Sequence, residues 1–332
     1  MAVERGLRIV NEDAAGVDTA FRDDVLAGLA QRRKAVPARW FYDEAGSRLF
    51  EAITALPEYY PTRAETEILA ANGAEFARLI GPARAVVEFG SGSSAKTPHL
   101  LRAIAPAAYV PVDISGEILR RSATALAQEF PALPVIPVEA DFTKPAALPS
   151  QVAGLPKLGF FPGSTIGNLV PPTAVDLLRS MHTTLHADGD QAAMLLIGMD
   201  RIKHPATLLA AYDDPAGVTA AFNLNLLDRI NRELGGNIPR DRFAHLVRWN
   251  DPLARIEMHL EALGDVAFEV AGTRFAMRRG ETIHTENSHK YGDRDAAVLL
   301  LAGGWTPLAS WSDAAGQFRA ILAGATESRG AP

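Results

Sequence analysis

The alternation of short apolar runs with helical patterns is the feature that most constrains the fold of this chain. Five apolar runs between residues 85 and 198 read as strands, and the stretches between them carry helical patterns. Strands that alternate with helices form βαβ units and a largely parallel, doubly wound sheet, whose ligands bind at the carboxyl ends of the strands. The predicted strands are Ala85–Phe89, Tyr109–Asp113, Val135–Val138, Leu158–Phe161 and Ala192–Gly198, and predicted helices end at Ile104 or span Ser115–Phe130 and Thr173–Leu185.

Two flanking regions depart from this alternation and predict a second lobe. The first has helical patterns and an aromatic segment, and the second has a long helical pattern followed by strand-like runs. A last strand of the sheet is expected at Ala297–Leu301. We therefore expect an α/β sheet domain formed by residues 64–199 and 291–332, and an α+β lobe formed by residues 8–63 and 200–290. In the second lobe the predicted helix is Gly217–Leu234, and the strand-like runs are Arg255–Ala262, Val266–Val270 and Thr282–Tyr291.

Composition excludes several classes of function. The chain has 332 residues, a formal charge of −6 and no cysteine, so disulfides, thiolate nucleophiles and cysteine zinc sites are ruled out. A mildly acidic chain without a long basic run is a poor ligand for nucleic acid. The N-terminus lacks a signal-peptide pattern and no apolar run approaches the roughly 20 residues of a membrane span, so we expect a cytoplasmic protein. The scattered histidines predict no metal site.

The glycine-bearing segment from Val86 to Thr97 is the strongest local signal. Glycines permit tight turns and close approach of the backbone, and the start of the following helix offers unpaired N–H groups to a polar or anionic cofactor. The pattern Gly90-x-Gly92-x-x-Ala95 also fits a dinucleotide fingerprint, with Asp113 placed to bind ribose hydroxyls. The loop alone therefore leaves three interpretations open: S-adenosylmethionine, NAD, or an ordinary turn of an α/β protein.

The pair Asp141-Phe142 favours S-adenosylmethionine. It follows the third predicted strand, where a methyltransferase places a carboxylate and an apolar residue around adenine. The rest of the chain has no obvious group for hydride transfer. The same pair is also typical of a helix cap with a core aromatic.

Several ordered blocks between residues 20 and 320 resemble one family. They are Trp40–Ser47, Leu49–Phe50, Leu56–Arg63, Gly90–Thr97, Pro162–Asn168, Ala211–Asp214, Gly217–Asn223, Arg255–Met258 and Ile283–Tyr291. Together they resemble the histidine Nα-methyltransferases of ergothioneine biosynthesis, which make trimethylhistidine (hercynine). The resemblance implies a class I methyltransferase sheet, S-adenosylmethionine as methyl donor, S-adenosylhomocysteine as its product, and a free amino acid as substrate.

The resemblance also implies which residues bind the methyl donor. Asp113 would accept hydrogen bonds from the ribose, Lys96 would meet the methionine carboxylate, and the backbone of Asp141 and Phe142 would frame the adenine. The full set is Gly90, Ser91, Lys96, Asp113, Asp141 and Phe142.

For the amino acid, the resemblance places Tyr59, Asn168 and Tyr212 at the backbone end. Asn168 carries both a donor and an acceptor, so it orients an amine without holding a charge. Tyr42 is a candidate for relaying a proton through water, which makes Asn168, Tyr59 and Tyr42 the candidate catalytic residues. The substrate set is Tyr59, Gly163, Thr165, Asn168, Tyr212, Met258, Glu286, Ser288 and Phe50.

Glu286 and Ser288 are the expected specificity pair. They lie two apart in a strand-like run, so both side chains fall on one face and reach the two nitrogens of an imidazole. We expect Thr282, His284 and Lys290 on the same face, a pattern that is equally typical of a polar strand facing solvent. Met258 would line the ring pocket. Tyr42 and Phe50 would offer aromatic faces to the quaternary ammonium that repeated methylation produces.

Three alternatives stay open. The first is a family member that acts on another free amino acid, such as a tryptophan derivative. The second is a non-catalytic relative that binds the cofactor, and the third is a nicotinamide oxidoreductase, suggested by the glycine loop alone. The number of methyl groups and the proton acceptor are not defined by the sequence, and we expect a monomer.

Overall fold

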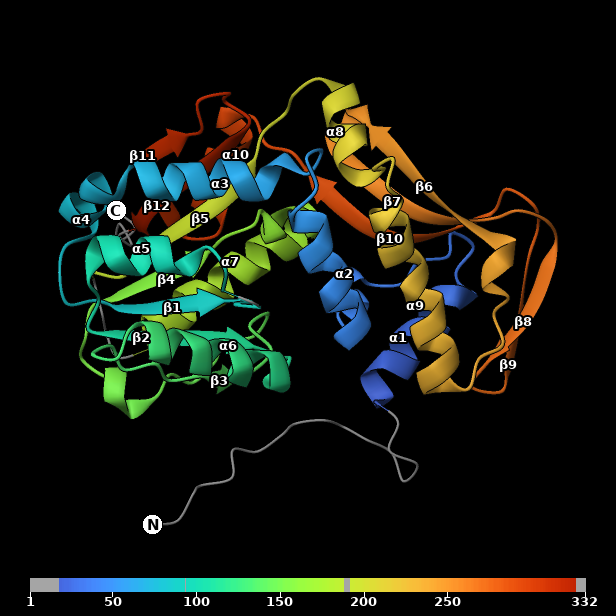
Figure 1. The fold of residues 1–332 in the computed structure, drawn as a ribbon, viewed down its shortest axis with the longest axis horizontal. Helices are drawn as coiled ribbons and strands as arrows, with labels where there is room; N and C mark the ends of the chain where they lie inside the picture. The colour runs from blue at the N-terminus through green and yellow to red at the C-terminus, as the bar shows by residue number, and fades with distance from the viewer. Residues whose placement is uncertain (1–17, 93, 188–191, 327–332) are drawn as a thin grey trace, which may run out of the picture. The chain divides into compact units, whose positions relative to one another are not determined.

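The computed structural model describes residues 18–92, 94–187 and 192–326 (Figure 1). These residues divide into two compact units. Unit 1 contains the chain up to Tyr60 and Lys203–His289, and unit 2 contains Pro61–Ile202 and the chain from Lys290 onward. Residues 8–17, 93, 188–191 and 327–332 of the expected domains lie outside the described residues. Each unit has its own hydrophobic core.

Unit 2 is built on a seven-stranded sheet in the order β11-β12-β5-β4-β1-β2-β3. The strands from β3 to β5 in this order are parallel, whereas β12 runs antiparallel to both β5 and β11. This order, with a reversed strand beside β5, is that of a class I methyltransferase sheet and confirms the expected fold class. The strands are β1 (Ala85–Phe89), β2 (Ala108–Asp113), β3 (Val138–Glu139), β4 (Lys157–Phe161), β5 (Met194–Asp200), β11 (Trp305–Ser312) and β12 (Phe318–Ala325).

Helices cover both faces of this sheet (Figure 1). Neighbouring strand residues point to opposite faces, so Val86 packs with α3, α4 and α5, whereas Val87 packs with α7 and α10. Burial on both faces explains why the central strands are almost entirely apolar. The helices are α3 (Tyr60–Ala71), α4 (Gly73–Ile80), α5 (Thr97–Ile104), α6 (Gly116–Glu129), α7 (Pro171–Leu185) and α10 (Asp293–Ala302), with 3₁₀ turns η2 (Ser150–Val152) and η3 (Thr165–Asn168).

The third strand is shorter than predicted. Val135 forms only an isolated bridge to Tyr109, and the regular strand is limited to Val138–Glu139. Tyr109 and Asp113 of β2 exchange backbone hydrogen bonds with this segment, but Pro111 between them has no N–H to donate, so the ladder is interrupted there.

The strand predicted at Ala297–Leu301 is wrong, because this segment belongs to helix α10. Leu299 and Leu300 are buried, while Val298 and Leu301 are about half exposed, at 55% and 51%. That pattern has the period of a helix and not the alternation of a strand. The sheet is completed instead by the hairpin of β11 and β12, which the sequence analysis did not anticipate.

Unit 1 combines helices with a three-stranded antiparallel sheet in the order β10-β7-β6 and a separate hairpin of β8 and β9. Helix α9 packs on this sheet and on α2. No helix in the described parts of either unit is long and apolar enough to cross a membrane. The elements are α1 (Thr19–Ala30), η1 (Ala38–Phe41), α2 (Glu44–Thr54), α8 (Pro205–Tyr212), α9 (Val218–Leu234), η4 (Arg240–Arg242), β6 (Phe243–Asn250), η5 (Asp251–Leu253), β7 (Arg255–Ala262), β8 (Val266–Val270), β9 (Thr273–Met277) and β10 (Thr282–His289).

A β-bulge in β10 changes which side chains share a face. The register shifts between His284, which lies opposite His259, and Glu286, which lies opposite Met258. Directly opposed residues share a face, whereas consecutive strand residues alternate. Glu286 and Ser288 therefore lie on the face of the buried Met258.

The same register corrects one expectation about this face. Thr282 lies opposite Glu261 and His284 lies opposite His259, so both lie on the face away from Glu286. Lys290 follows the last residue of β10 and belongs to neither face of the strand. The extra residue of a bulge shifts the alternation by one position, which the sequence pattern alone did not reveal.

Candidate functional site

The loop after β1 requires its glycines. Gly90 and Gly92 have φ values of 68° and 48°, a conformation that side chains with a Cβ rarely adopt. A Cβ on Gly90 would also lie 3.1 Å from the ring of Phe142. The structure thus brings two predicted cofactor residues, Gly90 and Phe142, into direct proximity.

Asp113 joins the loops that follow β1 and β2. One carboxylate oxygen accepts a hydrogen bond from the N–H of Gly92 at 3.0 Å, and the other accepts from the N–H of Ser115 at 2.8 Å. An ionised carboxylate has about four acceptor positions. Asp113 therefore fixes the glycine loop and keeps capacity to accept hydroxyl groups of a ligand.

Ser91 gives a direct test of whether a polar cofactor fits this loop. Its hydroxyl is buried and has no hydrogen-bond partner among the described residues. Buried hydroxyls are normally hydrogen-bonded. A ligand atom that bonds to Ser91 would satisfy this group, so the loop residues fit a cofactor with polar atoms.

Asp141 and Phe142 form a local turn at the end of β3. The Asp141 carboxylate accepts from the backbone N–H and the hydroxyl of Thr143, at 3.0 and 2.5 Å. The Phe142 ring packs against Phe161, with ring centroids 6.0 Å apart. Residues 140–149 form no helix, so the helix-cap interpretation of this pair is wrong, and the carboxylate closes only a short turn. We expect the ring and the backbone of the pair, rather than the carboxylate, to face a cofactor.

Lys96 is held by Glu65, a residue that the sequence analysis missed. Glu65 lies on α3 with 1% of its surface exposed, and its carboxylate binds the Lys96 ammonium and accepts the N–H of Gly163 at 2.8 Å. Its neighbours Ala64 and Ile68 are core residues. A glutamate flanked at helical spacing by apolar residues is the signal that could have identified this position.

The turn after β4 brings two more predicted residues next to Lys96. A Cβ on Gly163 would lie 3.5 Å from the hydroxyl of Thr165 and 3.7 Å from the Lys96 nitrogen. Asn168 ends the 3₁₀ turn η3 and is half-buried. Gly163, Thr165 and Asn168 therefore lie in unit 2, together with all the predicted cofactor residues.

A buried acid, Glu88, supports the glycine loop through the start of α5. It accepts hydrogen bonds from the hydroxyls of Tyr109 at 2.5 Å and Thr97 at 2.7 Å. Complete burial raises the pKa of the Glu88 carboxyl to about 7, although these two hydrogen bonds lower it. The sequence predicts Glu88 only as part of a strand.

In unit 1, an aromatic cluster gathers the predicted substrate residues. Tyr42 and Phe50 have ring centroids 5.6 Å apart, Phe50 and Tyr59 are 6.3 Å apart, and Tyr59 and Tyr212 are 6.1 Å apart. Phe222 of α9 contacts both Tyr42 and Phe50 and was not predicted. The structure therefore brings all four predicted aromatic residues together.

The aromatic cluster continues into the predicted specificity residues. The hydroxyls of Tyr212 and Ser288 lie 2.6 Å apart. Ser288 and Met258 are buried, at 4% and 1% exposure, and Glu286 lies opposite Met258 in the sheet. The Tyr212–Ser288 contact thus extends the aromatic cluster to β10, the strand that also carries Glu286.

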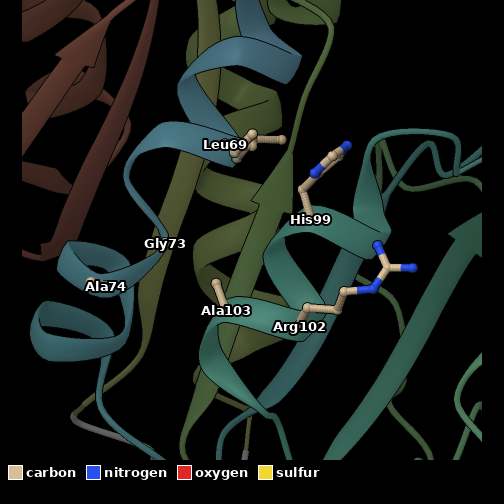
Figure 2. A pocket seen from close by; sticks show the side chains of 7 residues that line it. Leu69, Gly73, Ala74, His99, Arg102 and Ala103 are labelled. Atoms are coloured by element: carbon tan, nitrogen blue, oxygen red, sulfur yellow. The ribbon is translucent and has the colours of Figure 1, made fainter.

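A separate hollow of about 360 Å³ lies beside α3, α4 and α5 (Figure 2). The side chains of His99 and Arg102 come from α5, and Arg102 also pairs with Glu129 of α6. None of the predicted donor or substrate residues lines this hollow. Its lining residues are Leu69, Ala70, Gly73, Ala74, His99, Arg102 and Ala103.

Comparisons with known proteins cover almost the whole chain. A family model described as "Histidine-specific methyltransferase, SAM-dependent" matches residues 21–325. The chain is 41% identical over 320 residues to the histidine N-alpha-methyltransferase of Mycobacterium tuberculosis, which covers 95% of this chain and 97% of that relative. It is 40% identical to the protein of the same name from Mycolicibacterium smegmatis, covering 92% and 94%. The 4-dimethylallyltryptophan N-methyltransferase of Claviceps purpurea is 26% identical, covering 90% and 93%.

Proposed function

Because this chain belongs to the family of histidine-specific, S-adenosylmethionine-dependent methyltransferases, we propose that it methylates the α-amine of L-histidine. The product is trimethylhistidine (hercynine), used for ergothioneine biosynthesis. The observation that carries the substrate assignment lies in unit 1. There Tyr212 bonds to Ser288, and the bulge in β10 leaves Glu286 on the same face of the strand as Ser288.

The residues around the glycine loop fit the methyl donor. When bound, S-adenosylmethionine supplies a methyl group on a positively charged sulfur that is already a good leaving group. Asp113 accepts ribose hydroxyls, the buried hydroxyl of Ser91 gains a partner, and the ammonium of Lys96 meets a carboxylate. Gly90 allows close approach, while Asp141 and Phe142 flank the adenine. These assignments are supported by the orphaned Ser91 hydroxyl and the positive φ values of the loop.

The backbone end of histidine is assigned to Tyr59, Asn168 and Tyr212. The amine attacks only after it has lost its proton, so the site must hold a neutral amine in a fixed direction. The Asn168 amide both donates and accepts, which suits an uncharged amine. Positioning of this kind lowers a barrier by several kcal/mol. The family resemblance also assigns Thr165 and Gly163 to the substrate, and Tyr42 is the candidate for passing the proton of the amine to water.

The imidazole end is assigned to Glu286, Ser288 and Met258. The Glu286 carboxylate accepts the ring N–H, and the Ser288 hydroxyl, fixed by Tyr212, bonds to the second ring nitrogen. Met258 packs against the ring. Such a site rejects a ring without nitrogens, because its buried polar groups would then have no partners.

The aromatic cluster suits the charge that the product acquires. Each methylation brings the amine closer to a quaternary ammonium, and aromatic faces attract such cations. Tyr42, Phe50 and Tyr59 provide these faces. The monomeric state and the cytoplasmic location expected from the sequence stay predictions.

A mass-spectrometric assay tests the proposal. The purified protein is incubated with S-adenosylmethionine and each common amino acid in a separate reaction. We expect histidine alone to gain three methyl groups. Methylation of another amino acid, with histidine inert, would overturn the imidazole assignment and leave the donor assignment standing. Binding of S-adenosylhomocysteine without methylation of any amino acid would favour a non-catalytic relative.

A further inference from the structure

A buried chain of hydrogen bonds connects the substrate residues of unit 1 through Asn223 of α9. Asn223 has 0% of its surface exposed. Its amide nitrogen lies 2.8 Å from Nδ1 of His245 and 2.9 Å from the carbonyl oxygen of His259. Its amide oxygen accepts from the hydroxyl of Thr285 at 2.8 Å. Every hydrogen of this amide therefore has a partner from the sheet.

The direction of these bonds is fixed by the chemistry of the groups. The Asn223 nitrogen can only donate, so Nδ1 of His245 must accept. The other nitrogen of the ring, Nε2, then carries the proton and donates to the carbonyl oxygen of Tyr212 at 2.9 Å. Burial lowers the pKa of His245, which favours this neutral form.

Both ends of the chain of bonds reach the proposed histidine site. At one end, Tyr212 bonds through its hydroxyl to Ser288. At the other end, Thr285 is the residue at the bulge, next to Glu286, and its hydroxyl also lies 3.1 Å from the carbonyl oxygen of Met258. The two ends meet again at β10, so the network forms a closed frame around the specificity residues.

We propose that Asn223 is a positioning residue that sets the specificity for histidine, by holding the bulge at Thr285 and the backbone of Tyr212. This inference rests on the proposed function, because it assigns a purpose to the residues that frame the imidazole. Loss of the bulge would return Glu286 to the face of His259, since a shift of one residue exchanges the faces of a strand.

An apolar residue at this position would fill the same space without fixing the bulge. Leucine has the same number and branching of side-chain heavy atoms as asparagine, although its methyl groups are larger, and it would leave His245, Thr285 and the His259 carbonyl without their partner. Thr285→Val is a milder change, because valine keeps the shape of threonine and loses only the hydroxyl. Thr285→Ser keeps the hydroxyl and loses only a methyl group.

The test compares steady-state kinetics of these variants with histidine. For Asn223→Leu and Thr285→Val we expect the KM for histidine to rise roughly 10- to 100-fold, as misplacement by about an ångström does. The dissociation constant for S-adenosylhomocysteine, measured by titration calorimetry, should stay unchanged. Thr285→Ser should recover most of the lost affinity for histidine.

Two further measurements separate positioning from simple loss of structure. Asn231→Leu is the matched control, because Asn231 lies on the same helix and makes two bonds to Ile238, outside the site. It should lower the melting temperature and leave the KM for histidine unchanged. In a double-mutant cycle, Asn223→Leu should raise the KM for histidine only slightly when Glu286→Gln is already present, because both changes remove the contact between Glu286 and the imidazole.

The outcomes separate this inference from the proposed function. A wild-type protein that is inactive on histidine overturns both. An active wild type whose KM for histidine is unchanged in Thr285→Val and Asn223→Leu overturns only the role of Asn223. Fully additive effects in the cycle, or failure of Thr285→Ser to recover affinity, would also overturn it. If Asn223→Leu does not fold, the Thr285 pair alone decides.

Discussion

The hydroxyls of Tyr212 and Ser288, 2.6 Å apart, join the last residue of α8 to the penultimate residue of β10. Tyr212→Phe removes this bond without changing the ring. We expect the KM for histidine to rise by up to about ten-fold, the usual effect of one lost hydrogen bond. S-adenosylhomocysteine should bind as before in titration calorimetry. Wild-type kinetics in this variant would remove Tyr212 from the substrate site.

The Asp113 carboxylate offers a test of the donor site. Asp113→Asn replaces one acceptor oxygen with a donor, which conflicts with the N–H of Gly92 or of Ser115. We expect S-adenosylhomocysteine to bind on the order of 10- to 100-fold more weakly, because hydrogen bonds to charged groups are worth about 1.5–3 kcal/mol. Calorimetry measures this directly, and NAD serves as the control ligand. Unchanged affinity would remove Asp113 from the donor site.

The buried pair of Glu65 and Lys96 makes a prediction about stability. Glu65→Gln keeps the shape of the side chain and leaves the Lys96 ammonium without its counter-charge. We expect a loss of about 1–3 kcal/mol in the free energy of unfolding, measured by urea denaturation. Adding Lys96→Met should recover part of this loss, because no unpaired charge remains. A double variant less stable than Glu65→Gln would show that the pairing is not the source of the effect.

Glu88 predicts a specific pH dependence. Its pKa is about 7 in the folded protein against a usual value of 4.5. Because the folded state binds this proton more tightly, the stability from Glu88 is complete below pH 4.5 and is lost as the pH rises to about 7. Glu88→Gln mimics the protonated acid and does not titrate. As the pH rises through this range, the free energy of unfolding of the variant should therefore increase relative to that of wild type by on the order of 3 kcal/mol. Urea denaturation at pH 5 and pH 8 measures the difference. The same difference in free energy of unfolding between variant and wild type at pH 5 and at pH 8 would contradict the raised pKa of Glu88.

The central sheet was predictable because burial on both faces leaves few choices for the residues of its strands. Strand β1 was predicted residue for residue, and β2 and β4 to within one residue. The strand predicted at Ala297–Leu301 was wrong because a short apolar run looks the same in a buried strand and in a buried helix. The helical period becomes visible only when Val298 and Leu301 are seen to be exposed.

The site was predictable to the extent that a family resemblance marks residues one by one. Glu65 and Asn223 act through other side chains over separations of 31 and 62 residues, to Lys96 and Thr285. No local pattern joins such pairs. The bulge at Thr285 escaped for a related reason, since the register of a strand depends on its partner and not on its own sequence.

The position of β12 has a consequence for how the protein is made. This strand is the last element described along the chain, yet it fills an interior place in the sheet between β5 and β11. Until the ribosome has released it, the hydrogen-bonding edge of β5 has no neighbour on that side, and an open apolar edge invites aggregation. The nascent chain must therefore keep an unfinished sheet through the synthesis of more than a hundred residues, from Asp200 to Phe318. The yield of folded protein should therefore depend more on chaperone binding during translation than it does for a protein whose sheet closes early. Truncation near residue 317, which removes β12, should lower that yield.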